Sequence, residues 1–395
     1  MTGDGVDLRW TAEEEAFRAE ARGWLEAHKP RHLPPGDTAE GFPVHRAWER
    51  ELFEGGWAVV SWPKAYGGRD ATLWEWLIFE EEYYRAGLPQ RVAQNGIFLL
   101  APTVFEFGTQ EQQDRILPRM AGVEDMWCQG WSEPNAGSDL AGISSRAERD
   151  DAAGGWRLYG QKTWTTRGAF CNKLFGLFRT DPSAERHRGM TYLLVDLDQD
   201  GAVVRPVDKL DGDAGFAEVF FDGAFVPDAD VLGDVNQGWG VAMATTGSER
   251  GLTLRSPGRF QASVARLVDL RARLVAQGQP IDPVVDDAVV QAWIDAEAYA
   301  LNTFATVTRL STGAPMGPES SLNKVFWSEM DVRLNEAALG LLGDRAFLTA
   351  EAPDAVDEGA WGKAFIFALA GPIYAGTNEI QRNVIAERLL GLPRK

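Results

Sequence analysis

GWRLYGQKTWTT, residues 155–166, opens a series of short segments that are rich in aromatic and β-branched residues. It is followed by KLFGLFRT (173–180), MTYLLVDL (190–197) and AEVFFDGAFVP (217–227). Gly, Asp and Pro residues bound these segments, as is typical of short strands joined by turns. The pattern predicts a small antiparallel sheet or barrel, and we place a middle β-domain at residues 124–232.

The regions on either side have a helical pattern. Thr11 can cap a first helix, because Glu13, Glu14 and Glu15 follow in the turn where the helix dipole favours acids. Further helices are predicted at 45–56, 72–85, 95–107, 110–121, 238–274, 283–312, 318–351, 355–370 and 377–390. Long helices joined by short loops indicate a bundle. We therefore predict an α+β protein with a helical domain at 1–123 and a helical bundle at 233–395.

Composition narrows the classes of function. The net charge of −19 disfavours a nucleic-acid partner, because such a surface repels phosphate backbones. The two cysteines and four scattered histidines form no metal-binding pattern. The opening MTGDGVDLRW lacks the features of a signal peptide, and no apolar run approaches the roughly 20 residues of a membrane span. We expect a cytoplasmic protein with no metal and no membrane association.

Five strings in a fixed order extend the interpretation to the whole chain. They are WSEPNAGSDL (131–140), GQKTWTTRGAF (160–170), EVFFDGAFVP (218–227), GDVNQGW (233–239) and AGTNEIQRNVIAERLLGLPR (375–394). Their order and spacing resemble the acyl-CoA dehydrogenase family. The resemblance implies a helical N-terminal domain, a middle β-domain, a C-terminal four-helix bundle and bound FAD.

The resemblance also assigns residues to the flavin. SEPNAGSD combines small and polar residues, which suit close approach of a backbone to a ligand. The family match places Gln129, Trp131 and Ser132 at the flavin, and Ser138 where the acyl-CoA chain passes. Gln129 and Trp131 are not the usual residues there, so we expect their backbone groups to make the contacts.

TWTT, at 163–166, alternates in the manner of a strand. From the sequence alone, core packing is the commoner fate of a tryptophan such as Trp164. The resemblance instead places Trp164 against the flavin and Thr166 near the hydride-accepting N5 atom. In the last motif it assigns Thr377 to the flavin, although a plain helix cap would use the same residue type.

The largest departure from the family lies at Ala375. Dehydrogenation needs a base for the α-proton, and many relatives carry a glutamate immediately before the GT of the last motif. A methyl group cannot accept a proton. The backbone N–H of Ala375 can still donate to the thioester carbonyl, as the resemblance implies, and its small side chain leaves room for a bulkier acyl group.

A subset of the family carries the base on the first helix of the C-terminal bundle, before an arginine. Here TGSERG (246–251) places Glu249 before Arg250 at the matching position. A solvated Glu–Arg pair is the plainer interpretation, but the small residues around it indicate close packing. We predict Glu249 as the base, while Arg250 either supports the helix or faces CoA phosphate.

Three functions follow from these assignments. The first is an FAD-dependent acyl-CoA dehydrogenase in which Glu249 removes the α-proton, flavin N5 takes the β-hydride and an electron-transfer flavoprotein or similar acceptor takes the electrons. The second is a non-catalytic or half-active subunit of a mixed oligomer, which Ala375 would fit. The third is a flavin oxidase or monooxygenase on the same fold. The resemblance also implies a homo-oligomer or a heterotetramer with a second family chain.

Overall fold

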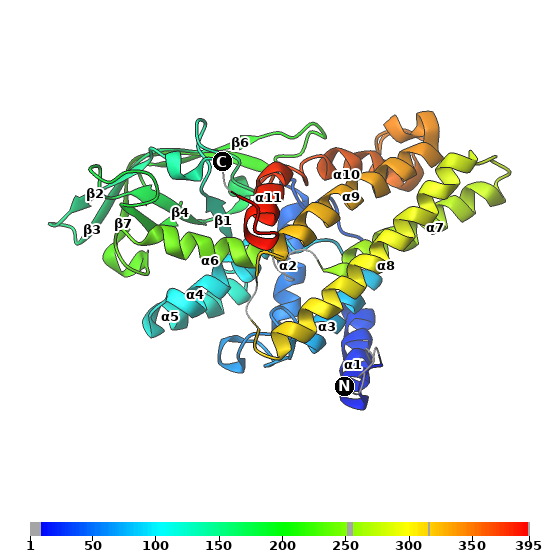
Figure 1. The fold of residues 1–395 in the computed structure, drawn as a ribbon, viewed down its shortest axis with the longest axis horizontal. Helices are drawn as coiled ribbons and strands as arrows, with labels where there is room; N and C mark the ends of the chain where they lie inside the picture. The colour runs from blue at the N-terminus through cyan, green and yellow to red at the C-terminus, as the bar shows by residue number, and fades with distance from the viewer. Residues whose placement is uncertain (1–8, 251–255, 315–316, 394–395) are drawn as a thin grey trace.

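A computed structural model describes residues 9–250, 256–314 and 317–393, with the side chains of 248–250 outside that description (Figure 1). The N-terminal part is helical, as predicted. Its elements are α1 (Ala12–His28), α2 (Gly41–Glu54), η1 (Lys64–Tyr66), α3 (Leu73–Arg85), η2 (Asn95–Leu100), α4 (Ala101–Phe107) and α5 (Gln110–Ala121). Capping boxes at Thr11, Thr72 and Thr109 begin three of these helices, since each threonine and a Glu or Gln three residues later exchange side-chain-to-backbone hydrogen bonds.

The middle part forms the predicted β-domain. Its strands are β1 (Trp127–Gly130), β2 (Arg146–Asp150), β3 (Gly155–Lys162), β4 (Lys173–Arg179), β5 (Met190–Asp196), β6 (Ala202–Val207), β7 (Phe216–Pro227) and β8 (Val231–Leu232). Within the described ranges they make one sheet in the order β6-β7-β3-β2-β4-β5-β8, with β1 added to β4. Most pairings are antiparallel, whereas β1 pairs with β4 in parallel because more than 40 residues separate the two strands in the chain. Short 3-10 turns lie at η3 (Leu140–Gly142), η4 (Gly168–Phe170) and η5 (Asp228–Asp230).

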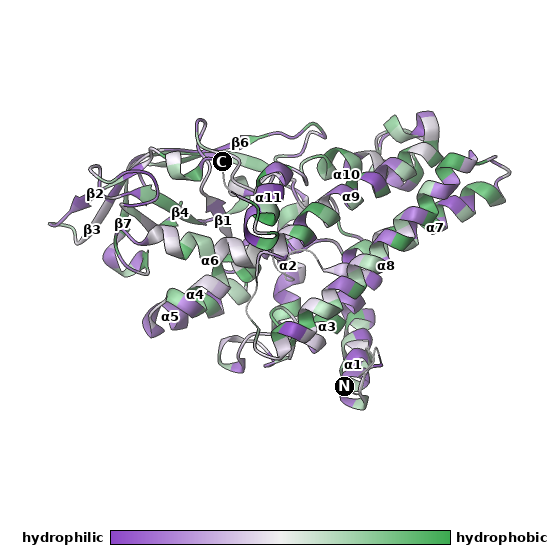
Figure 2. Cartoon of the chain, in the orientation of Figure 1, coloured by the Kyte–Doolittle hydropathy of each residue, from purple (hydrophilic) through white to green (hydrophobic). Residues whose placement is uncertain are grey.

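The C-terminal part is a helical bundle. It contains α6 (Gly238–Arg250), α7 (Pro257–Ala276), α8 (Pro283–Ser311), α9 (Ser320–Leu342), η6 (Gly343–Phe347), η7 (Val356–Gly359), α10 (Ala360–Ala368), α11 (Asn378–Val384) and η8 (Ile385–Leu389). Hydrophilic and hydrophobic residues alternate along α7 and α8 in Figure 2, as expected for helices with one buried face. Their apolar faces meet α9 in a core of their own.

The single helix predicted at 238–274 is wrong. α6 ends at Arg250 and α7 begins at Pro257, whose missing N–H suits a first helical turn. The Ser256 side chain caps the new helix by accepting from the N–H of Gly258 at 3.2 Å. The break separates α6, which contacts strand β5, from α7, which packs against α3, α8 and α9.

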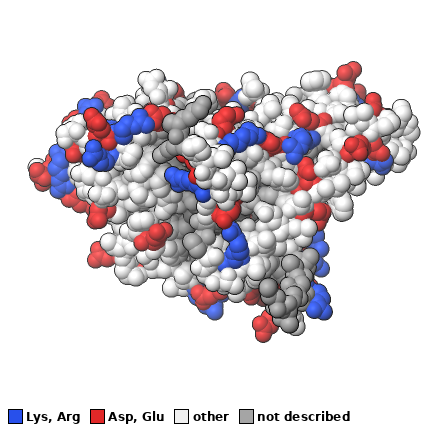
Figure 3. Space-filling view, in the orientation of Figure 1, with Lys and Arg blue, Asp and Glu red and all other residues white. Residues whose placement is uncertain are grey.

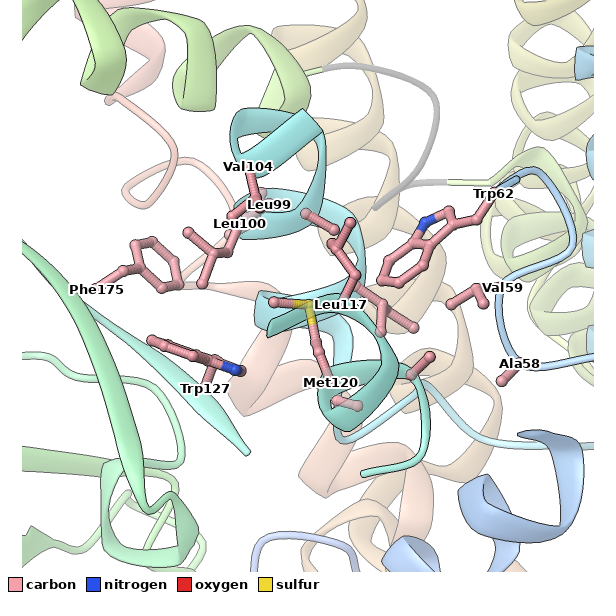
Figure 4. Packing of buried hydrophobic residues seen from close by; sticks show 14 of the residues in the cluster. Ala58, Val59, Trp62, Leu99, Leu100, Val104, Leu117, Met120, Trp127 and Phe175 are labelled. Atoms are coloured by element: carbon pink, nitrogen blue, oxygen red, sulfur yellow. The ribbon is translucent and has the colours of Figure 1, made fainter. Parts of the chain in front are cut away.

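The N-terminal helices and the sheet share one core. Figure 4 shows Trp127 of β1 and Phe175 of β4 facing Leu99 and Leu100 at the end of η2. Met120 of α5 lies in the same cluster, and all five side chains are almost fully buried. This contact fixes the helical domain against one side of the sheet, which is where the candidate site is built.

Candidate active site

Helix α6 connects all three parts of the molecule. Its first residue, Gly238, lies so close to β5 that a β-carbon there would be 2.5 Å from the backbone nitrogen of Tyr192. Along its length α6 contacts η2, α4 and α9. Gly258, just after α7 begins, packs against the α3 backbone, where a β-carbon would lie 2.8 Å from Glu81 Cα. Near the C-terminal end of α6, the Thr245 hydroxyl oxygen lies 3.3 Å from that of Tyr192 on β5, so this part of the helix lies between the β-domain and the N-terminal helices.

Glu249 and Arg250 occupy the last turn of α6. Their side chains lie outside the described residues, so the predicted base remains a prediction. Just before them, Thr245 is buried and its hydroxyl oxygen lies 2.9 Å from that of Thr103 on α4. The small residues that preceded Glu249 in the sequence thus include one that packs directly against a neighbouring helix, as expected.

The two predicted flavin segments of the β-domain are neighbours. The Thr163 N–H donates to the Ser132 carbonyl at 2.9 Å, which joins 129–132 to 163–166. Gln129 pairs with Phe175 in the sheet. Trp131 is buried edge-on against Tyr192, and within the described ranges its indole N–H has no hydrogen-bond partner. The Trp131 ring therefore packs inside the β-domain.

A buried ion pair that the sequence analysis did not predict joins these two segments. Lys162 Nζ lies 2.8 Å from Glu133 Oε1, and the side chains are 0% and 4% exposed. Glu133 also accepts from the N–H groups of Ser144 and Ser145, and Lys162 donates to the Leu177 carbonyl. Burial alone would raise the pKa of Glu133, but Lys162 and these hydrogen bonds outweigh it and lower the pKa to about 2.

Trp164 is not a core residue. Strand β3 ends at Lys162, and Trp164 follows with a left-handed backbone (φ 56°) that interrupts the alternation predicted for TWTT. Its side chain is 63% exposed and meets Phe216 edge-on at 5.7 Å. A left-handed backbone at a tryptophan costs about 1–3 kcal/mol of conformational free energy. The surrounding structure must therefore hold Trp164 in this conformation, with its ring projecting away from the sheet. Thr166, two residues on, is half-buried.

Ser138, the residue predicted to meet the acyl-CoA chain, lies in the exposed part of the 131–140 segment. Its neighbour Asp139 pairs with Arg186 at 2.7 Å on the surface. The structure therefore places Ser138 on the solvent side of the segment that also carries Trp131 and Ser132.

The turn at 374–377 has a left-handed backbone at two successive residues, Ala375 (φ 57°) and Gly376 (φ 78°). Thr377 then caps α11, since its side-chain oxygen accepts from the N–H of Ile380 at 3.3 Å. The cap named in the sequence analysis is therefore present. The cap uses an oxygen lone pair of Thr377, and the same hydroxyl hydrogen-bonds the Glu379 carboxylate.

Ion pairs link the β-domain to the loop between α1 and α2 and to α10. Asp37 lies 2.6 Å from Arg167 Nε and 3.2 Å from Lys209 Nζ. Burial alone would raise the pKa of Asp37, but these two cations outweigh it and lower the pKa. Lys363 on α10 contacts Asp213 at 2.6 Å, so the helix that precedes the turn is tied to the loop beside Trp164.

The sequence analysis expected no metal site and no membrane-spanning segment. No helix among the residues described is both long and apolar enough to cross a bilayer. Over the same ranges, no group of three His, Cys, Asp or Glu side chains could hold a metal ion. Basic and acidic side chains are interspersed on the face seen in Figure 3.

Comparison with known proteins shows to which family the chain belongs. Residues 11–124, 128–224 and 236–390 match the N-terminal, middle and C-terminal domains of acyl-CoA dehydrogenases. The chain belongs to the acyl-CoA dehydrogenase family. It is an oxidoreductase of that type, and members of the family are FAD-dependent flavoproteins. The fold class, the family resemblance and the cofactor expected from the sequence are thereby confirmed.

Individual relatives cover almost the whole chain. It is 40% identical to acyl-CoA dehydrogenase IpdE1 of Mycolicibacterium smegmatis, over 97% of this chain and 99% of the relative. Identity to IpdE1 of Mycobacterium tuberculosis is 39%, over 96% and 98%. Among solved structures, the Tcur3481-Tcur3483 steroid ACAD superposes with a TM-score of 0.87 at 26% identity, covering 99% of this chain and 100% of that one. The ChsE4-ChsE5 complex of Mycobacterium tuberculosis has a TM-score of 0.83 at 28% identity, covering 99% and 100%.

The residues present fit a flavin. An exposed indole held in a strained conformation offers a planar surface for a planar ring, and Thr166 adds a hydroxyl beside it. The polar turn at 375–377 adds backbone groups and the Thr377 hydroxyl. Sequence reasoning named these residues but missed the anchors behind them, Lys162 and Glu133, because a lone strand lysine is indistinguishable from a surface one.

Proposed function

We propose that this protein dehydrogenates an acyl-CoA thioester to the trans-2-enoyl-CoA, with Glu249 as the base. The observation that carries the proposal is the pairing of two positions. The turn that holds the acid in many relatives carries Ala375, while α6, which contacts all three parts of the molecule, carries Glu249 in its last turn. A carboxylate is the group needed to accept the α-proton, and Ala375 cannot supply one.

The remaining roles follow from the same arrangement. The backbone N–H of Ala375 donates to the thioester carbonyl and stabilises the negative charge that develops as the α-proton leaves. Ser138 and Arg250 meet the CoA portion. The flavin would be held by Gln129, Trp131, Ser132, Trp164, Thr166 and Thr377. When bound, FAD supplies the acceptor for the β-hydride at N5.

A bulky acyl group is the proposed substrate class. One similar structure is described as a steroid ACAD, and replacing a glutamate by Ala375 removes side-chain volume beside the proposed thioester site. Both considerations favour a ring-bearing acyl chain over a short linear one. The electron acceptor is proposed to be an electron-transfer flavoprotein or a similar carrier.

Two similar structures are named as pairs of chains, Tcur3481-Tcur3483 and ChsE4-ChsE5. We therefore keep a second candidate, in which this chain acts within a mixed oligomer that also contains a second family chain. Ala375 favours that candidate, whereas Glu249 and the segments at 131–140 and 163–166 favour a chain with its own activity. An oxidase or monooxygenase would differ in the speed with which oxygen reoxidises the reduced flavin.

The test uses the chain purified alone. Its flavin spectrum is recorded, and linear, branched and ring-bearing acyl-CoA esters are titrated anaerobically. Bleaching of the flavin, most rapid with ring-bearing esters, is the expected result. A clear preference for short linear esters contradicts the substrate class. Flavin that no ester bleaches, but that is bleached after a second family chain is added, supports the mixed oligomer.

A further inference from the structure

Gln381, in α11, holds the turn that contains Ala375. Its side-chain Nε2 lies 2.9 Å from the Ala375 carbonyl oxygen and 3.4 Å from that of Gly376. Both carbonyls can only accept hydrogen bonds, so the donating end of the amide must face them. One side chain therefore bonds the two residues whose backbones are left-handed.

The amide is itself held from behind. Ser321 of α9 donates its hydroxyl to Gln381 Oε1 at 2.7 Å. Both Ser321 and Gln381 are 0% exposed, so water does not compete for these bonds. The hydroxyl thus fixes which end of the amide points toward the turn, and α9 becomes the rigid support of the contact.

The backbone closes the turn on itself. Asn378 N–H donates to the Pro372 carbonyl at 2.8 Å, and Gln381 N–H donates to the Thr377 carbonyl at 2.9 Å. The Asn378 side chain accepts from Lys324 at 2.8 Å and from Ser328 at 3.1 Å, both on α9. The base of the turn is fixed on either side, so the peptides around Ala375 are the part that depends on Gln381.

Alanine has no intrinsic reason to adopt this backbone conformation. In the left-handed conformation the β-carbon lies too close to the following carbonyl oxygen, so this conformation is strained for alanine relative to the right-handed one. The bond from Gln381 fixes the Ala375 carbonyl, and the dihedrals of Ala375 then set the direction of its N–H. If the bond were lost, Ala375 could relax and its N–H would rotate away.

From this geometry we propose that Gln381, oriented by Ser321, is a positioning residue that aims the Ala375 N–H at the substrate carbonyl. The inference rests on the proposed function for its purpose, because the N–H matters there as the donor to the thioester. Its mechanical part, that Gln381 maintains the left-handed Ala375, stands on the contacts alone.

The mechanical part is tested first and needs no substrate. Ala375→Gly is made in the wild type and in Gln381→Met, and the thermal unfolding midpoint of all four proteins is measured. Because glycine adopts a left-handed backbone without strain, Ala375→Gly should raise the midpoint in the wild type. In Gln381→Met the gain should vanish, since the turn has already relaxed. An equal gain in both backgrounds overturns the proposal.

If Gln381→Met does not fold, Ser321→Ala replaces it in the test. This variant keeps the glutamine and removes only the hydroxyl that orients its amide. In Ser321→Ala the gain in unfolding midpoint on Ala375→Gly should then be reduced, but by less than in Gln381→Met. Gln279→Met is the matched control. Gln279 also donates to a backbone carbonyl, that of Leu341 at 2.9 Å, while its oxygen accepts from Arg345, but it lies in the loop between α7 and α8. In Gln279→Met, Ala375→Gly should raise the unfolding midpoint by as much as it does in the wild type.

The second measurement reports the hydrogen bonding of the substrate carbonyl, to which the Ala375 N–H is proposed to donate. An acyl-CoA labelled with 13C at the thioester carbonyl is bound, and the downshift of its infrared stretch is compared among the variants. The downshift should shrink in Gln381→Met and remain whole in Gln279→Met. kcat should fall about tenfold to a hundredfold in Gln381→Met with little change in KM. A full downshift in Gln381→Met overturns the positioning role. If the unfolding midpoints behave as expected in a protein whose flavin no ester bleaches, the mechanical part stands and the proposed function is rejected instead.

Discussion

Two segments of this protein carry a left-handed residue that is not glycine at the proposed site, and they are held in opposite ways. Trp164 (φ 56°) follows Lys162, whose ammonium pairs with the buried Glu133 carboxylate. Ala375 (φ 57°) is held by the neutral amide of Gln381. The ion pair anchors the backbone behind an exposed ring, whereas the amide contacts the strained residue directly. The backbone before Trp164 therefore depends on a buried charge pair, whereas the backbone of Ala375 depends on the geometry of a hydrogen bond.

The largest expected effect tests the charged anchor. Lys162→Met leaves Glu133 buried without its partner, which should cost about 3–5 kcal/mol of unfolding free energy, measured by urea denaturation. The matched control is Lys173→Met in the same sheet. Its pair with Asp196 is 2.7 Å long, but the two side chains are 23% and 47% exposed, so about 1 kcal/mol or less is expected. Equal losses of unfolding free energy in the two variants would mean that the buried ion pair anchors the backbone no better than an exposed one.

A smaller effect tests the exposed ring. Trp164→Ala should barely change the stability of the flavin-free protein, because the side chain is 63% exposed. The dissociation constant of FAD should rise about tenfold, as expected when one aromatic stacking contact is lost. Trp293→Ala on α8, where the tryptophan is 54% exposed, is the control and should leave FAD binding unchanged. A marked drop in stability of the flavin-free Trp164→Ala protein would mean that the ring has a structural role instead.

Much of the fold could be predicted, because local signals determine it. Thr109 and Gln112 form the capping box that begins α5, and the helix predicted at 110–121 matches the observed one. The break between α6 and α7 was missed, although Ser256 and Pro257 are a recognisable start signal. The periodic pattern continues through the break, so periodicity alone suggested one helix.

Candidate site residues could be proposed from the sequence, whereas the residues that hold them in place could not. The resemblance named Trp164 and Ala375, but the strand-like alternation of TWTT could not reveal that β3 ends two residues before Trp164. Gln381 contacts Ser321 across 60 residues of sequence, and a pairing at that distance leaves no local trace in a single chain. Residues that hold a site from behind look, in sequence, like ordinary polar residues.

We propose that the base lies on α6 and that the turn at Ala375 supplies only a backbone donor. The most direct test is the anaerobic rate at which an acyl-CoA ester bleaches the flavin of Glu249→Gln, relative to the wild type. A fall of about 10²-fold or more, with FAD content and unfolding midpoint unchanged, is the predicted result. Bleaching at the wild-type rate would contradict the claim and place the base elsewhere in the site.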